Sequence, residues 1–288
     1  LTLLILSFLS KFFQFSRLFG QPSLTVFIFS RDRPQFLRTF LLSFQYHYRL
    51  NLSHRIFVVY SASSDASHLC YLNLSQEFSH FLFVSESDYG GFAATVKSIF
   101  SRQTSTHTQF LLDDNLFVRD IAIQPHYLRS LFSILSLRLS PHCTYCYMQD
   151  THQSPPSFYP LDTYHQFYWA SSSSNDWSCP HSIDGNIFPN ILIYPFISFL
   201  PFKSPTFLEQ SLRFLKFIPR LSGLCFDHPS LINIPATPVN SSSSNRYNED
   251  SNLFSHQFSS ILRYKYPDPA FIDSTHLNLL IENLGNYC

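Results

Sequence analysis

The first third of the chain carries two alternating patterns of apolar positions. Residues 24–30, Leu-Thr-Val-Phe-Ile-Phe-Ser, form a β-branched and aromatic run that is too short for a helix, so they predict a buried strand. Pro34 then suits the first turn of a helix, and apolar residues recur with helical spacing from residue 36 to residue 44. The sequence therefore predicts a strand that leads directly into a helix.

The same pattern is repeated along the next part of the chain. Strands are expected at residues 55–60, 80–84 and 109–112, and helices at residues 69–78 and 92–100, with residues 63–65 offering a helix cap. Parallel strands need crossover connections, and this alternation supplies them. We therefore expect an α/β fold with a mostly parallel central sheet flanked by helices.

The pattern is less regular in the second half of the chain. It predicts helices at residues 121–137, 191–200 and 205–217 and a strand at residues 144–148, with loops at the serine tracts 171–174 and 241–244. Ser204 is expected to cap the last of these helices, and Pro205 to occupy its first turn.

Composition narrows the function. The 288 residues have a formal net charge of zero, so the basic surface that dominates nucleic-acid binding is missing, and no nucleic-acid partner is expected. With 45% hydrophobic residues, 32 Phe and 16 Tyr, the chain can bury a core rich in aromatic rings. The six glycines are unusually few, so a missing glycine says little against a motif.

Location is predicted from the N-terminal residues and the cysteines. The apolar stretch at residues 1–9 is followed by Lys11 and is too short to span a membrane, so residues 1–20 are expected to be an apolar or amphipathic lead-in, with a truncated signal anchor as the alternative. The six cysteines show no second ligand pair for a zinc site and are expected to be free thiols. These features favour a cytoplasmic protein and leave peripheral membrane association open.

Asp113, Asp114 and Asn115 come directly after the fourth predicted strand. Ligands of open α/β sheets bind beyond the carboxyl ends of the strands, and carboxylate and amide oxygens suit Mg²⁺ or Mn²⁺. This acidic turn is therefore a candidate metal site that could hold the diphosphate of a nucleotide. The alternative is that Asp114 or Asn115 only caps a helix over residues 116–119.

A resemblance over residues 24–246 favours the metal interpretation. Residues 29–34 (Phe-Ser-Arg-Asp-Arg-Pro) and 110–117 (Phe-Leu-Leu-Asp-Asp-Asn-Leu-Phe) resemble the first loop and the metal-binding strand end of bacterial-type family-2-like glycosyltransferases of the GT-A fold. Residues 139–147, 175–188 and 232–235 resemble segments of uncharacterised members of that group. The usual Asp-x-Asp pattern is Asp-Asp-Asn here, which leaves open which residue meets the metal.

The resemblance implies a metal-dependent transferase that moves a sugar from a nucleoside-diphosphate donor to a carbohydrate or other hydroxyl acceptor. It implies that residues 21–150 form the nucleotide-sugar-binding half and residues 151–288 the acceptor-side half of one domain. Arg31 and Asp65 lie where the loops after the first two strands would approach the nucleotide. A solvated loop cation and a helix cap are the alternatives for these two residues.

Catalysis with inversion needs a general base, and Asp184 and Asp176 are the candidates in the second half. Asp184-Gly185 is also a common turn dipeptide, and Trp177 could belong to the core rather than stack on a sugar. Two other functions remain as alternatives. One is a non-catalytic GT-A-fold relative that binds a carbohydrate or a partner, and the other is a different nucleotide-using α/β transferase, such as a nucleotidyltransferase.

Overall fold

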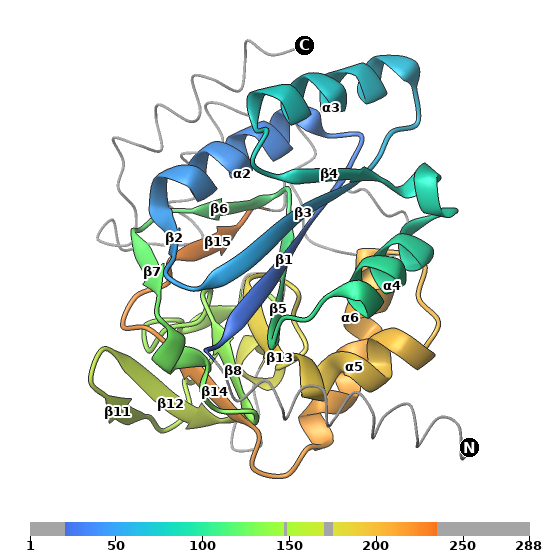
Figure 1. The fold of residues 1–288 in the computed structure, drawn as a ribbon. Helices are drawn as coiled ribbons and strands as arrows, with labels where there is room; N and C mark the ends of the chain where they lie inside the picture. Colours follow the sequence, from blue (N-terminus) through green and yellow to red (C-terminus); the bar gives the residue numbers. More distant parts are fainter. Residues whose placement is uncertain (1–20, 147–148, 170–174, 235–288) are drawn as a thin grey trace.

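A computed structural model of the chain describes residues 21–146, 149–169 and 175–234. Four of its strands form the regular part of the central sheet (Figure 1). They are β1 (Ser23–Arg31), β3 (Ser53–Ser61), β4 (Leu82–Ser85) and β5 (His107–Leu112). β1 pairs in parallel with both β3 and β5, and β3 pairs in parallel with β4. All four strands were predicted from the sequence, and their parallel pairing is confirmed.

Both faces of this sheet are buried, as the unbroken apolar run of β1 requires. Val26 and Ile28 pack into one hydrophobic cluster, whereas Phe27 and Phe29 pack into another on the opposite face. Successive side chains of a strand point to opposite faces, so one strand contributes to both clusters.

Helices cover the two faces in separate groups (Figure 1). α2 (Pro34–His47) and α3 (Asp65–Glu77) contribute to the first cluster. α4 (Phe92–Arg102), α5 (Asn190–Phe199) and α6 (Pro205–Leu212) contribute to the second. The predicted α/β class, with a mostly parallel central sheet flanked by helices, is confirmed.

Five shorter strands extend the sheet to nine strands in the order β11-β12-β14-β8-β13-β5-β1-β3-β4. They are β8 (Ser133–Ser136), β11 (Tyr159–Leu161), β12 (Tyr164–Tyr168), β13 (Asn186–Pro189) and β14 (Ser222–Cys225). β13 is antiparallel to both β5 and β8, and β12 is antiparallel to both β11 and β14. One sheet therefore runs through both halves of the chain.

Small two-stranded pairings and 3₁₀ helices complete the described elements. The pairings are β2 (Tyr48–Leu50) with β7 (Ile121–Ile123), β6 (Asn115–Phe117) with β15 (Leu231–Asn233), and β9 (Tyr145–Cys146) with β10 (Thr151–His152). The 3₁₀ helices are η1 (Glu86–Tyr89), η2 (Pro125–Leu128), η4 (Asn175–Ser178) and η5 (Arg213–Phe217).

Two helix predictions are wrong. Residues 121–137 form β7, η2 and β8 instead of one helix, because β7 pairs with β2 and β8 pairs with both β13 and β14. The alternative that placed a helix at residues 116–119 is also wrong, since β6 occupies that region and pairs with β15. In both places partners that are distant in sequence override the local pattern.

The other helix predictions of the second half are confirmed. α5 spans most of the predicted range, and Ser204 caps α6 by accepting a hydrogen bond from the backbone N–H of Phe207. The predicted strand at 144–148 is reduced to β9 within the described residues. The predicted lead-in at 1–20 and the serine tracts at 171–174 and 241–244 lie outside them.

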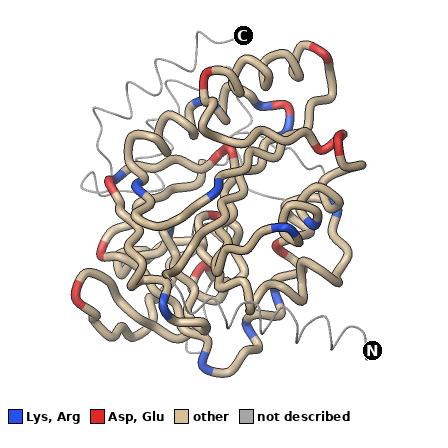
Figure 2. The backbone as a smooth tube through the Cα atoms, viewed as in Figure 1, with Lys and Arg blue, Asp and Glu red and all other residues tan. Residues whose placement is uncertain are grey.

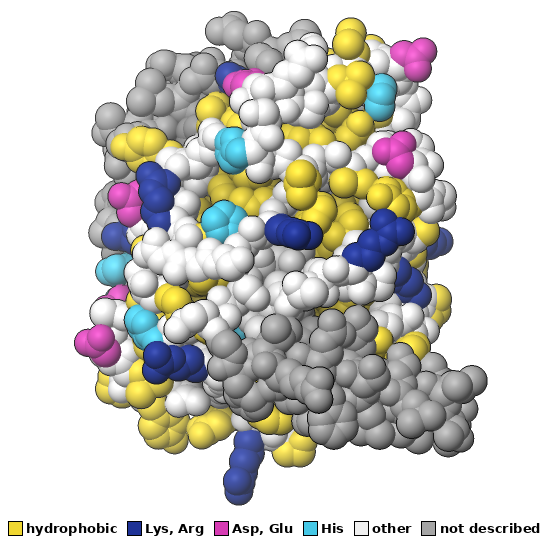
Figure 3. Space-filling model, in the orientation of Figure 1, with side chains coloured by type: hydrophobic (Ala, Val, Ile, Leu, Met, Phe, Trp, Pro, Cys, Tyr) yellow, Lys and Arg dark blue, Asp and Glu magenta, His cyan; other side chains and the backbone are white. Residues whose placement is uncertain are grey.

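Surface charge is sparse along the described chain, and both signs are interspersed (Figure 2). Apolar side chains reach the surface on the face shown in Figure 3, with cationic groups beside them. None of the described helices is long and apolar enough to cross a membrane. Cys143, Cys146, Cys179 and Cys225 are thiols that form no disulfide, as predicted, whereas Cys70 is disulfide-bonded and departs from that prediction.

Candidate functional site

The candidate site lies at the carboxyl ends of β1, β3, β4 and β5. Because these strands are parallel, the loops that follow them meet at one edge of the sheet, where ligands of open α/β sheets bind. The loop after β1 is tied to the loop after β3, since the carboxylate of Asp32 accepts a hydrogen bond of 2.6 Å from the backbone N–H of Ser63. Asp32 adopts a positive φ of 52°, which an Asp tolerates better than most residues.

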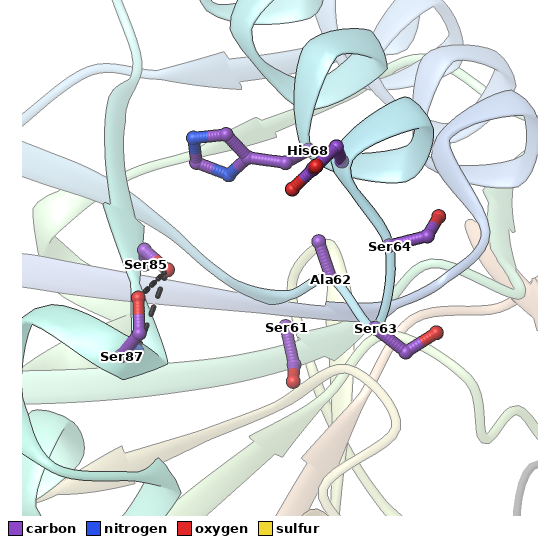
Figure 4. Close-up of a pocket in the computed structure, with 8 residues that line it drawn as sticks. Ser61, Ala62, Ser63, Ser64, His68, Ser85 and Ser87 are labelled. Atoms are coloured by element: carbon purple, nitrogen blue, oxygen red, sulfur yellow. Dashed lines mark hydrogen bonds between the residues drawn. The ribbon is translucent and has the colours of Figure 1, made fainter.

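A polar pocket of about 200 Å³ opens at this edge (Figure 4). Hydroxyl groups dominate its lining, and the residues come from the end of β3, the start of α3 and the end of β4. They are Ser61, Ala62, Ser63, Ser64, Asp65, His68, Ser85 and Ser87. Ser64 caps α3 by accepting a hydrogen bond from Ser67, and Asp65 occupies the first turn of that helix. Hydroxyls, one carboxylate and an imidazole suit a ligand rich in hydrogen-bonding groups.

Asp113 is buried and held by three donors. The hydroxyl of Ser30 donates to its Oδ2 at 2.8 Å, Nε of Arg33 lies 3.3 Å from the same oxygen, and Nη2 of Arg33 donates to Oδ1. Tyr71 on α3 extends the network, because its Oη lies 2.7 Å from Oγ of Ser30. Burial raises the pKa of Asp113 above its usual value, and the charge of Arg33 and the hydrogen bonds from Ser30 and Arg33 oppose that rise.

Arg33 also lies close to the second carboxylate of the turn, with Nη2 at 3.8 Å from Oδ2 of Asp114. Burial alone would lower the pKa of Arg33, but the charges of Asp113 and Asp114 hold that pKa above its usual value. The guanidinium is therefore a permanent cation between two carboxylates.

Asp184 belongs to the same network as the acidic turn. Nδ2 of Asn233 donates to Oδ1 of Asp114 at 3.1 Å and lies 3.3 Å from Oδ1 of Asp184. Nδ2 of Asn115 donates to the same oxygen of Asp184 at 3.2 Å. Asp184 thus lies beside the turn, bonded directly by Asn115 and bridged to Asp114 by Asn233.

The turn that carries Asp184 depends on Gly185, which has a φ of +80°. A Cβ atom at this position would come within 2.3 Å of the side chain of Leu231 in β15, and the backbone N–H of Gly185 donates to Phe110 in β5. Close packing against two strands therefore fixes the place of Asp184.

Glu209, on α6, is a carboxylate that the sequence reasoning did not assign to the site. Its Oε1 accepts a hydrogen bond of 3.3 Å from the backbone N–H of Ile183, directly before Asp184. Burial, and next the charge of Asp184, raise the pKa of Glu209 to about 7. Glu209 therefore lies against the segment that carries Asp184 and is a second carboxyl group on this side of the site.

Asp176 has a structural environment. Its Oδ1 lies 2.9 Å from Nη1 of Arg138, and Oδ2 accepts a hydrogen bond from Gln153 at 3.1 Å. Burial alone would raise its pKa, but Arg138 holds the pKa of Asp176 below its usual value. The neighbouring Trp177 is fully buried and donates to the carbonyl of Cys143, so it belongs to the core.

The arrangement of the acidic turn does not fit a divalent ion as it stands. Both oxygens of Asp113 are engaged by Arg33, and Oδ1 of Asn115 accepts a hydrogen bond of 2.8 Å from the backbone N–H of Leu112. Among the described residues, no group of three His, Cys, Asp or Glu side chains is placed to hold a metal ion.

The sequence-predicted site residues fall into three groups. Asp113, Asp114, Asn115 and Asp184 share one network, whereas Asp176 is paired elsewhere. Arg31, at the end of β1, and Asp65, in the first turn of α3, are exposed. Ser30, Arg33, Tyr71, Glu209 and Asn233 join the site without having been singled out. Of these, Ser30, Arg33 and Asn233 stand in segments that carried the resemblance, which was the signal available for them.

Comparisons with known proteins give distant structural similarities. No protein-family model and no curated protein sequence matches the chain. A crystal structure of residues 1–349 of Staphylococcus aureus TarS is similar over 92% of this chain and 71% of that one, at 12% identity and a TM-score of 0.42. A TarS 1–349 complex with UDP-GlcNAc is similar over 92% and 72%, at 11% identity and a TM-score of 0.42.

The mannosyltransferase PcManGT from Pyrobaculum calidifontis, in complex with GDP-Man and Mn²⁺, is similar over 83% of this chain and 67% of that one. Its identity is 11% and its TM-score 0.44. These values are too low to carry the activity or ligands of either protein over to this chain.

Proposed function

We propose that this protein is a glycosyltransferase of the GT-A kind that moves a sugar from a nucleoside-diphosphate donor to a hydroxyl acceptor. The observation that carries the proposal is the convergence of three features at one edge of a parallel sheet. These are the polar pocket beside Asp65, the acidic turn at Asp113 and Asp114, and the carboxylate of Asp184 bridged to that turn by Asn233.

The polar pocket is assigned to the nucleoside part of the donor. The carboxylate of Asp65 can accept hydrogen bonds from ribose hydroxyls, and the serine hydroxyls around it can bond either to the base or to the ribose. Arg31 lies at the end of β1, at the same edge of the sheet, and its side chain is 62% exposed. Its positive charge suits the diphosphate.

Asp184 is assigned as the general base of a transfer with inversion. As the acceptor oxygen forms its bond to the sugar carbon, its proton passes to the Asp184 carboxylate and the bond to the nucleoside diphosphate breaks. Glu209, whose pKa is raised to about 7 by burial and next by the charge of Asp184, can hold a proton beside the segment of Asp184 near neutral pH. The sequence-based assignment of Asp113, Asp114 and Asn115 to Mn²⁺ or Mg²⁺ stays a prediction, and it requires Arg33 to move away.

The acceptor is assigned to the carboxyl-terminal half, as the sequence suggested. Phe207, Phe214 and Phe217 are exposed there, and each has the charged group of a Lys or Arg near its ring. Aromatic rings and cations together suit a carbohydrate acceptor, and the same surface would serve the predicted peripheral membrane association.

A non-catalytic binding protein is the second candidate, and one observation favours it. The hydrogen bonds among Asp114, Asn115, Asp184 and Asn233 satisfy the side chains that a transferase would use on its substrates. Donor turnover separates the two functions, because both would bind a nucleotide sugar but only the transferase would release the free nucleoside diphosphate in the presence of an acceptor.

Thermal unfolding with UDP-, GDP-, CMP- and dTDP-sugars tests the donor site, because a ligand of the folded state raises the unfolding temperature. We expect one donor class to stabilise the protein, and Asp65→Asn to weaken its binding by about tenfold or more through loss of a charged hydrogen-bond acceptor. Asp162→Asn is the matched control, since it removes the same charge from an exposed turn. Stabilisation by none of the donors would contradict the proposal.

A further inference from the structure

Arg33 is fixed at the start of α2 by its own backbone. It holds the position just before the helix, Pro34 follows in the first turn, and its backbone N–H donates to Oη of Tyr71 at 3.1 Å. The guanidinium also lies 5.4 Å from the ring centre of Phe36. Local structure therefore directs this side chain towards the acidic turn.

The guanidinium occupies the space in front of both carboxylates of that turn. Nη2 donates to Asp113 and lies 3.8 Å from Asp114, while Nε lies 3.3 Å from Asp113. The Arg33 side chain is only 15% exposed and that of Asp113 only 1%. Little water is present to screen a second cation from the guanidinium at this depth.

The guanidinium of Arg33 nevertheless has one nitrogen that makes no hydrogen bond. Nη1 is buried and has no hydrogen-bond partner among the described residues. An unmade hydrogen bond at a buried donor costs free energy, which lowers the cost of releasing the side chain from the turn. Release of the guanidinium would therefore lose its contacts with Asp113 but allow Nη1 to form the hydrogen bond that it lacks.

We infer that Arg33 is the resident cation of the acidic turn, and that Arg33 and a divalent metal ion exclude each other there. A metal that used Asp113 would need oxygens that Arg33 already engages, and it would bring two positive charges next to a third. Metal binding then requires the Arg33 side chain to leave the turn. This inference concerns the cations alone, so it holds or fails whether or not the protein transfers a sugar.

Mn²⁺ titration of the nucleotide-free protein tests it, with free Mn²⁺ measured by electron paramagnetic resonance. Arg33→Gln should bind Mn²⁺ about tenfold or more tightly than the wild type, because a positive charge beside two carboxylates has been removed. Arg38→Gln is the matched control, because it removes a cation from α2, the helix that Arg33 precedes, and Arg38 pairs with Glu77 instead. Arg38→Gln should leave the affinity unchanged. Equal affinity of Arg33→Gln and the wild type, or equal gains in both variants, would overturn the inference.

Arg33→Gln leaves Asp113 buried without its main partner and could fold poorly, so a second measurement uses the unaltered protein. Crystals soaked in Mn²⁺ are examined by anomalous diffraction. The inference is supported if the turn holds Arg33 and no Mn²⁺, or Mn²⁺ with the Arg33 side chain displaced. It is overturned if Mn²⁺ binds Asp113 or Asp114 while Arg33 still bridges the two carboxylates.

Discussion

The two halves of the sheet differ in the regularity of their strands. On one side, β5, β1, β3 and β4 are parallel and alternate with α2, α3 and α4. On the other side, β13, β8, β14, β12 and β11 are short and mixed in direction, and an ion pair between Arg138 and Asp176 connects segments between them. Apolar packing holds both halves, since Leu135 and Ile134 of β8 pack into the same two clusters as Val26 and Phe27 of β1. We call these the regular half and the irregular half.

This difference explains how each half positions its residues at the candidate site. The regular half brings four loops to one edge simply because its strands are parallel. The irregular half contributes Asp184, Glu209 and Asn233, which reach that edge only through contacts between residues far apart in sequence. We therefore expect substitutions in the irregular half to change chemistry or stability, and substitutions in the pocket of the regular half to change binding.

The largest expected effect is on turnover. Asp184→Asn should lower sugar transfer by about 100- to 10,000-fold, the usual contribution of a positioned proton acceptor, while leaving donor binding nearly unchanged. Single-turnover transfer and donor affinity are measured on the same preparation. Loss of both in Asp184→Asn would instead assign Asp184 to donor binding, and full transfer would reduce it to a turn residue.

A smaller effect is expected on the pH dependence of stability. The pKa of Glu209 is raised from 4.5 to about 7, so the folded state binds this proton more tightly than the unfolded chain. Its contribution is complete below the unfolded pKa and is lost as the pH rises through the folded one, at a cost on the order of 3 kcal/mol. Glu209→Gln should flatten the fall in unfolding free energy across this window. Parallel pH profiles of the unfolding free energy in the variant and the wild type would show that the pKa of Glu209 is not raised in the folded protein.

The smallest expected effect is a difference in unfolding free energy between two variants, each of which breaks one ion pair in one half. Arg138→Met leaves Asp176 partly buried without its charged partner, which should lower the unfolding free energy by about 2–3 kcal/mol. Arg38→Met breaks the pair with Glu77, whose side chain is more exposed (29% against 19% for Asp176), and should cost about 1 kcal/mol or less. Denaturant unfolding measures both. Similar losses would mean that the irregular half depends on its polar contacts no more than the regular half does.

The sequence was most informative where local pattern decides the structure. The apolar run of β1 and the helical spacing that follows it predicted the regular half, and with it the position of Asp113 and Asp114 at the end of β5. At residues 121–137 the local pattern misled, because pairings with distant strands decide that segment. Arg33 stands in a segment that carried the resemblance, but only the folded chain shows that its side chain turns to Asp113.

The tryptophans give this division an optical consequence. The chain has two, Trp169 and Trp177, and both are buried in the irregular half. The ring centre of Phe167 lies 4.8 Å from that of Trp169 and 5.1 Å from that of Trp177. Tryptophan fluorescence, excited at the red edge of protein absorption, therefore reports the packing of the irregular half alone. Far-ultraviolet circular dichroism reports the backbone of both halves. Whether the two signals are lost together during unfolding tells directly whether one shared sheet makes the halves a single cooperative unit.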